Sequence, residues 1–162
     1  MKPYLPKFLA SAVAVAVFVP ASVLAFDLTG TWVGKWTCKG SDGGKFVGNN
    51  ADSVLLVTQI GETIAMSMDG GSYVYNGGAV PDATRPDEKG EMAAISCDTD
   101  LLPLVGGEGE MIRAKVKTGA DGSGSLKGKS IIEGSGPGFV GSCKYVYTRT
   151  SSVNPAVSGC LN

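Results

Sequence analysis

The residues best able to bind a metal ion or transfer protons lie between positions 98 and 110. Four carboxylates occur there, at Asp98, Asp100, Glu108 and Glu110. Calcium takes about six to eight oxygen ligands, and a pair of carboxylates also serves most glycoside hydrolases. However, the segment lacks the D-x-D-x-D-G order of a calcium hand, and nothing in the sequence sets the separation of the acids. We therefore interpret residues 98–109 as a solvated loop, and predict no metal, no cofactor and no catalytic residue.

The chain has no histidine. This removes Ser–His and Cys–His catalysis and every histidine-ligated metal site. The cysteines are far apart and form no C-x-x-C pair, which argues against a thioredoxin-like site or an all-cysteine zinc site. An even number of cysteines in an exported protein is typical of disulfides. The four are Cys38, Cys97, Cys143 and Cys160.

Met66 and Met68 lie on one face of an expected strand, at positions 63–68. Two thioethers are ligands that copper(I) accepts. Without histidine or a free thiolate the set is too small for a copper site, so we interpret both methionines as flexible packing in the protein interior.

Residues 1–25 have the pattern of a secretory signal peptide. Lys2 and Lys7 precede an apolar run over 8–24, and Val23 and Ala25 provide the small residues that signal peptidase requires. The mature chain would be residues 26–162, a length that suits a single domain. No second apolar run is long enough to span a membrane. The sequence thus predicts a protein of the periplasm or of the cell exterior.

The charge balance of the mature chain is weakly acidic. Removing residues 1–25 leaves 12 of the 14 lysines and arginines against 15 acids, a net charge of about −3. The sequence shows no stripe of basic residues. We therefore expect no nucleic acid partner and no attraction to anionic membrane surfaces.

The elements that would hold these residues are β-strands, since apolar and polar residues alternate along most of the mature chain. Glycine-rich turns separate the segments, and no long 3.6-residue repeat follows residue 25. We expect long loops at 39–50, 76–89 and 98–109. The expected strands are 29–38, 53–60, 63–68, 73–75, 91–97, 110–117, 125–133 and 141–150. A meander of eight strands leaves two exposed edges unless it closes, so we predict an all-β, antiparallel up-and-down barrel.

Closure can be tested by pairing the first strand with the last. If Cys38 is placed opposite Cys143, Trp36 faces Tyr145 and Trp32 faces Arg149. All of these residues then share one face of their strands, as the two-residue period of a strand demands. The cysteines were used to choose this register, but the Trp32–Arg149 contact was not.

The segment Gly30-Thr31-Trp32, with Arg149 in the matching late position, resembles the pattern of lipocalins and the wider calycin group. The resemblance implies a lipocalin-like barrel in which Arg149 packs over Trp32 and closes one end. The chain departs from that family in being short and in having no evident helix after the last strand. Avidin-type barrels begin with a similar strand and lack the helix, so they are the nearest alternative.

Four cysteines allow three connectivities, and all three remain open. If Cys38 pairs with Cys143, the remaining bond is Cys97–Cys160. That bond would tie the C-terminal tail to the barrel wall, as in similar barrels, and each bond would contribute on the order of 2–4 kcal/mol.

The function that follows from this fold is the binding of a small apolar or aromatic ligand without catalysis. The residues expected to line the site are Trp36, Tyr145, Tyr147 and Met66, whereas Trp32 and Arg149 are structural. The alternative is an interaction module whose barrel is filled and whose long loops bind a protein partner. Small residues on the inner face would favour the first hypothesis, and Gly34, Ala65, Ala93 and Ala114 are the candidates. Tyr75 faces either inward or outward, depending on the side that Val74 takes.

Overall fold

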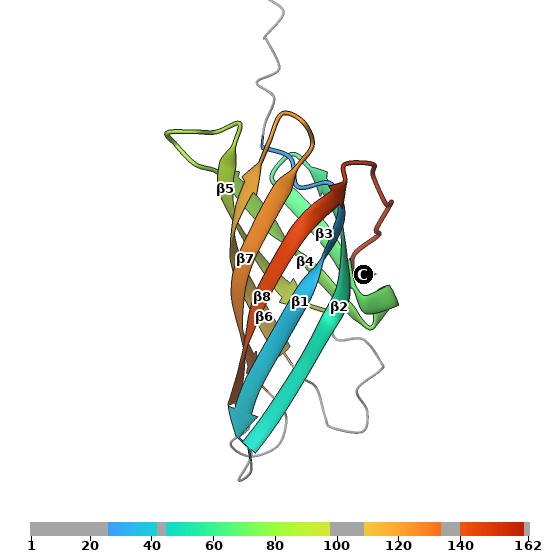
Figure 1. Cartoon of the computed structure of the whole chain (residues 1–162), viewed down its shortest axis with the longest axis vertical. Coiled ribbons are helices and arrows are strands. Elements are labelled where there is room, and N and C mark those ends of the chain that lie inside the picture. The colour runs from blue at the N-terminus through green and yellow to red at the C-terminus, as the bar shows by residue number, and fades with distance from the viewer. Residues whose placement is uncertain (1–25, 42–44, 98–108, 134–139, 161–162) are drawn as a thin grey trace, which may run out of the picture.

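The computed structural model describes residues 26–41, 45–97, 109–133 and 140–160. The described chain forms a closed antiparallel barrel in which each strand pairs with the next and the first pairs with the last (Figure 1). The strands are β1 (Gly30–Ser41), β2 (Lys45–Ile60), β3 (Thr63–Met68), β4 (Tyr73–Pro81), β5 (Lys89–Ser96), β6 (Gly109–Thr118), β7 (Gly124–Glu133) and β8 (Val140–Ser151). A short 3-10 helix, η1 (Asp69–Gly71), joins β3 to β4. The prediction of an all-β, eight-stranded up-and-down barrel is confirmed.

Alternation along the strands sends apolar side chains into the barrel, as the pleat of a strand requires. In β6, Ile112, Ala114 and Val116 are buried, while the residues between them are exposed. The buried interior also contains large side chains from the other strands: Trp32, Leu55, Val57, Ile64, Met66, Met68, Tyr75, Met92, Leu126, Tyr145 and Tyr147. Ala65 and Ala93, expected to widen the interior, lie on the outer face. The described interior is therefore packed with side chains along most of its length.

Of the expected long loops, 39–50 is largely strand and 76–89 is half strand. Residues 45–50 belong to β2 and residues 76–81 belong to β4. The glycines and asparagines of these segments weaken strand propensity, but the pairing of neighbouring strands overrides it. Because β1 continues to Ser41, the start of β2 pairs with it from Asn50 back to Lys45. Residues 98–108 of the third expected loop lie outside the described residues.

The register at the seam agrees with the one tested in the sequence. Cys38 lies opposite Cys143, Trp36 opposite Tyr145, and Trp32 opposite Arg149. The Cys38–Cys143 disulfide links β1 to β8 inside the barrel. The second disulfide is Cys97–Cys160. Both predicted bonds are thus present, and they indicate an oxidising compartment.

One end of the barrel, here called the Trp32 end, is closed by the residues that precede β1. Phe26 and Leu28 are buried there, and the indole Nε1 of Trp32 donates to the carbonyl of Leu28 at 3.0 Å. The Arg149 guanidinium lies 5.6 Å from the centre of the Trp32 ring and donates to the carbonyls of Asp27 and Thr29. Gly30 has φ 145°, and a Cβ there would overlap the carbonyl oxygen of Ser151. The glycine, tryptophan and arginine of the motif therefore form one packed unit.

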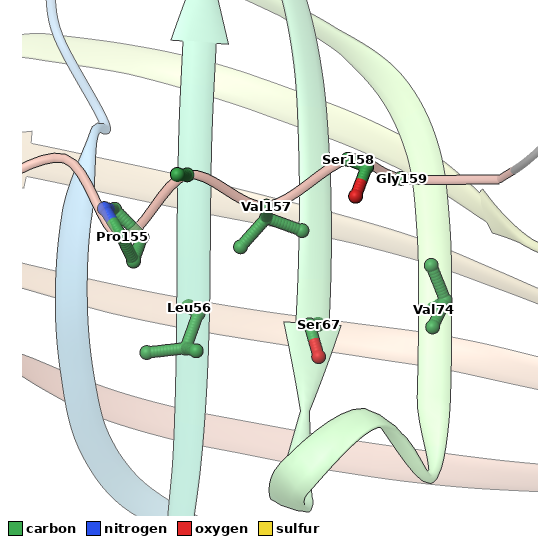
Figure 2. A pocket seen from close by; sticks show the side chains of 8 residues that line it. Leu56, Ser67, Val74, Pro155, Val157, Ser158 and Gly159 are labelled. Carbon is green, nitrogen blue, oxygen red and sulfur yellow. The ribbon is translucent and has the colours of Figure 1, made fainter.

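The C-terminal tail leaves β8 and crosses the outer face of β2, β3 and β4 (Figure 2). The Thr58 hydroxyl donates to Asn154 and accepts from the backbone nitrogen of Val157, and Cys160 is bonded to Cys97 beyond β5. A shallow groove runs between the tail and the sheet. It is lined by Leu56, Ser67, Val74, Pro155, Ala156, Val157, Ser158 and Gly159.

Two sequence predictions concern the surface and the N-terminus. The expectation of no basic stripe is wrong, because the register of β6, β7, β8 and β1 gathers separate lysines onto one outer face.

The predicted signal peptide, residues 1–25, lies outside the described residues. Within the described part of the chain, no helix is long and apolar enough to cross a bilayer.

Candidate functional site

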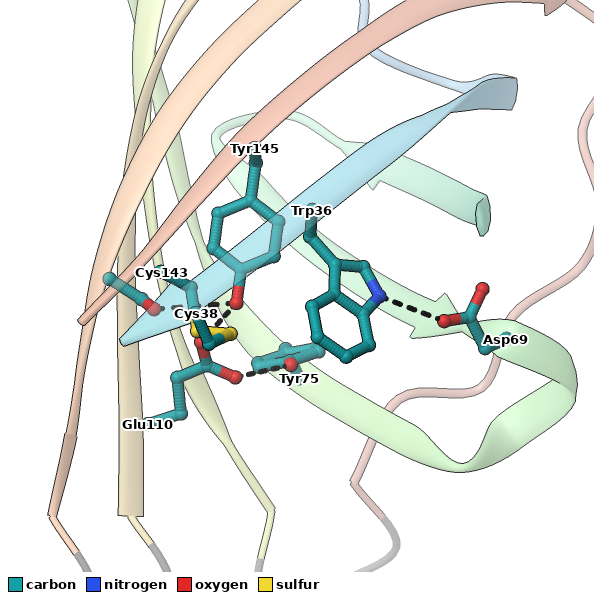
Figure 3. Close-up of a disulfide and its surroundings, with 8 residues drawn as sticks. Trp36, Cys38, Asp69, Tyr75, Glu110, Cys143 and Tyr145 are labelled. Atoms are coloured by element: carbon teal, nitrogen blue, oxygen red, sulfur yellow. Dashed lines mark hydrogen bonds between the residues drawn. A yellow bond between two sulfur atoms is a disulfide. The ribbon is translucent and has the colours of Figure 1, made fainter. Parts of the chain in front are cut away.

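A carboxylate lies inside the barrel near the end opposite Trp32. Glu110, in the inward series of β6, is 8% exposed. The hydroxyl of Tyr75 on β4 donates to its Oε2 at 2.7 Å, and the hydroxyl of Tyr145 on β8 donates to its Oε1 (Figure 3). Ser130 on β7 shares a hydrogen bond of 3.3 Å with Tyr145. We call Glu110, Tyr75, Tyr145 and Ser130 the Glu110 site.

The two phenols remain protonated hydrogen-bond donors. Burial, and then the neighbouring Glu110 carboxylate, raise the pKa of both Tyr75 and Tyr145 far above the ordinary value for tyrosine. A phenolate beside a buried carboxylate would place two negative charges in an apolar interior. At neutral pH each oxygen of Glu110 therefore accepts one phenol proton donor.

A second carboxylate, Asp69 in η1, accepts hydrogen bonds beside this site. Its Oδ2 accepts from the indole Nε1 of Trp36 at 3.1 Å and from Asn50 at 3.0 Å. Its Oδ1 accepts from the hydroxyl of Ser53 at 2.7 Å and from the backbone nitrogen of Val54 at 3.0 Å. The register between β1 and β2 shifts at this place, so Asp69 satisfies donors that flank the irregularity in β2.

The hydrogen bonds of Asp69 decide its charge. Partial burial alone would raise the pKa of the carboxyl group, but the bonds from Ser53, Trp36, Val54 and Asn50 together lower the pKa below its usual value. Ser53 also shares a 2.7 Å hydrogen bond with the Tyr147 hydroxyl, whose pKa is raised by burial to about 12. Ser53 thus connects a tyrosine inside the barrel to Asp69.

The structure brings three of the four predicted ligand-binding residues together. Trp36 is half-buried and lies beside Tyr145 (Figure 3). Tyr145 and Tyr147 stack with their ring centres 6.4 Å apart and an interplanar angle of 14°. Met66 is fully buried in the core, opposite Tyr75 across β3 and β4. Met68 is also buried in the core.

The sequence analysis did not assign Glu110, Asp69 or Ser53 to a binding site, and it left the direction of Tyr75 open. Glu110 was correctly placed at the start of the expected strand 110–117, but it was grouped with the loop acids as a candidate carboxylate and its inward direction was not recognised. A signal was available, since Glu110 is in phase with Ile112 and Ala114 on the inner face. Asp98, Asp100 and Glu108 lie outside the described residues. In the described ranges, no three acids or cysteines gather in a way that could hold a metal ion.

The Glu110 site combines a buried carboxyl group with aromatic rings and few competing hydrogen-bond donors. Among the described side chains of the inner face, the only basic one is Arg149, at the Trp32 end. A buried carboxylate without an opposite charge is costly, and tryptophan and tyrosine rings attract cations. This arrangement is suited to holding a positively charged or strongly hydrogen-bonding group.

The chain was compared with family models, curated proteins and solved structures, and none of them matches it. The class of protein therefore follows from the fold alone. It is a closed eight-stranded antiparallel β-barrel with two disulfides, compatible with a calycin-like fold.

Proposed function

We propose that this protein is an exported, non-catalytic binding protein of lipocalin-like type that takes a small ligand with a protonated amine at the Glu110 site. The observation that carries the proposal is the buried Glu110 carboxylate, which has two phenol donors and no basic partner among the described residues. This ligand class differs from the apolar or aromatic ligand expected from the sequence, because it carries a positive charge.

The packing of the barrel supports a small ligand rather than a large one. The interior between the Trp32 end and the Glu110 site is filled by buried side chains such as Leu55, Met66 and Leu126. Trp36 is half-buried and lies beside Tyr145, so we expect a ligand to reach Glu110 past its ring. An ammonium group there would gain a charge-assisted hydrogen bond to Glu110 and a cation–π contact with Trp36.

The proposal is tested by titrating the protein with three ligands of one shape and different charge. Phenethylamine, 2-phenylethanol and phenylacetate share a phenyl ring with a short side chain. That side chain ends in an ammonium, a hydroxyl and a carboxylate group, respectively. We expect isothermal titration calorimetry to show binding of the amine, weaker binding of the alcohol and no binding of the acid.

The matched variant is Glu110→Gln, which keeps the shape of the side chain and removes its charge. Replacing a charge-assisted hydrogen bond by a neutral one should weaken amine binding about tenfold. A variant that binds the amine as well as the native protein, or a native protein that prefers phenylacetate, would overturn the proposal. Native mass spectrometry of protein from its own source then identifies any ligand that it carries.

A further inference from the structure

The outer face of β6, β7, β8 and β1 carries a concentration of positive charge, which we call the basic face. All of its members are exposed. They are Lys35, Lys39, Arg113, Lys115, Lys117, Lys127, Lys129 and Lys144. The mature chain has a net charge of about −3, so this face is a local excess of positive charge within an acidic protein.

The register places like charges directly opposite one another. Arg113 is paired with Lys129, and Lys129 is paired with Lys144. In the next row Lys115 faces Lys127. Like charges at paired positions destabilise a sheet. Within the described side chains, the one ion pair formed by this face joins Lys115 to Glu91 at 4.0 Å. Most of its charge is therefore available to an external anion.

An apolar row borders the basic face. Ile95, Met111 and Ile131 are paired in sequence across β5, β6 and β7, and their exposed fractions are 58%, 52% and 63%. Met111 lies two residues before Arg113, and Ile131 lies two residues after Lys129. The apolar row therefore runs along the side of the basic face nearest the Glu110 end. Three large apolar side chains in one exposed row are typical of a contact surface.

We propose that this surface docks the protein on an anionic lipid membrane. The basic face would contact lipid phosphates, and the apolar row would enter the boundary between headgroups and acyl chains. Peripheral membrane proteins bind in this way, because burial of apolar side chains and attraction to anionic lipids act together. A soluble polyanion would use the lysines but would gain nothing from Ile95, Met111 and Ile131, so the apolar row favours a membrane.

The experiment measures binding of the secreted or periplasmic protein, expressed as the full chain, to vesicles by co-sedimentation. One set of vesicles contains equal parts of phosphatidylglycerol and phosphatidylcholine, and the other contains phosphatidylcholine alone. The test variant is Lys129→Glu, and the matched control is Arg85→Glu, in the loop between β4 and β5. Both substitutions change the net charge equally, so any difference reports position rather than total charge.

We expect binding to the anionic vesicles only, and an affinity about 30-fold lower for Lys129→Glu, since each unit of charge near an anionic surface changes affinity about fivefold. Arg85→Glu should change it less than about twofold. Lys129→Glu places an acid between Arg113 and Lys144, so the fold should gain stability and unfolding cannot explain a loss of binding. Equal losses in the two variants, or equal binding to both kinds of vesicle, would overturn the proposal.

A second pair of variants separates a membrane from a soluble polyanion. Met111→Ser with Ile131→Ser removes the centre of the apolar row, and Ile60→Ser with Val80→Ser removes exposed apolar residues elsewhere. We expect only the first pair to weaken vesicle binding, about tenfold, and neither pair to change binding to inorganic polyphosphate. If the first pair leaves vesicle binding unchanged while polyphosphate binds, the face recognises soluble polyanions and the membrane proposal is wrong.

Discussion

Asp69 has a backbone conformation that is uncommon for a residue with a side chain. Its φ is 52°, in the left-handed region that glycine usually occupies. The carboxylate is turned toward β1 and β2, where it accepts four hydrogen bonds, and these offset the cost of the backbone. The sequence Asp-Gly-Gly predicts a turn at 69–71. The direction of the Asp69 carboxylate, however, depends on the register shift between β1 and β2. No local sequence pattern reveals that shift.

Asp69→Asn should destabilise the protein at neutral pH. The amide cannot accept at both positions, so donors from Trp36 and Asn50 lose their partner, at a cost of about 1–3 kcal/mol. Because the folded pKa of Asp69 lies below its unfolded value, the stabilisation is present above about pH 4 and is lost as the pH falls through the folded pKa. Urea denaturation at pH 7 and pH 3 should show a large difference between variant and native protein at pH 7 and a smaller one at pH 3.

The control for this prediction is Asp52→Asn, an exposed aspartate in β2. It should change the free energy of unfolding by less than about 0.5 kcal/mol. A difference between Asp69→Asn and native protein that is the same at both pH values would show that the charge of Asp69 does not stabilise the fold.

At the scale of the elements, the closure of the barrel depends on how closely β1 and β8 approach. Gly34 lies opposite Tyr147 at this seam. A Cβ on Gly34 would overlap the carbonyl oxygen of Val146 and come within 2.6 Å of the Cα of Tyr147. Since backbone atoms cannot rotate away as a side chain can, the two strands would have to separate.

Gly34→Ala should therefore cost more than about 2 kcal/mol of unfolding free energy, near the upper range for overpacking. The matched control is Gly78→Ala in β4, where the nearest atom to a new Cβ is the carbonyl oxygen of Glu62 at 3.4 Å. That substitution should change stability by less than about 0.5 kcal/mol. Chemical denaturation of both variants provides the comparison, and equal costs would contradict a tight seam.

The strands and their closure could be predicted because the two-residue period is local and the cysteines supply one long-range constraint. The bounds of β2 and β4 could not, because residues 45–50 and 76–81 are strand only through the partners that flank them. The basic face escaped prediction for the same reason. Lys129 and Lys144 are distant in sequence and become neighbours only through the register of β7 and β8.

At the scale of the whole molecule, one prediction concerns cleavage after Ala25 together with the two disulfides. Phe26 is buried at the Trp32 end, so a chain that begins there would use its first residue as part of the barrel closure. We predict that protein from its own source has a denatured mass equal to that of residues 26–162 less four hydrogens, two for each disulfide. Mass spectrometry before and after reduction checks both statements. A mass that includes residues 1–25 would contradict cleavage at Ala25.

The pairing of β1 with β8 joins cysteines that are not consecutive in the chain, which has a consequence for an exported chain. In a chain exported N-terminus first, Cys38 and Cys97 reach the oxidising side before Cys143. Joining cysteines in order of arrival would create a bond absent from the folded barrel, because the native bonds join the first cysteine to the third and the second to the fourth. If the cysteines pair in order of arrival, correct maturation then requires exchange between thiols and disulfides. A cell that lacks disulfide isomerase activity should accumulate this protein with Cys38 bonded to Cys97.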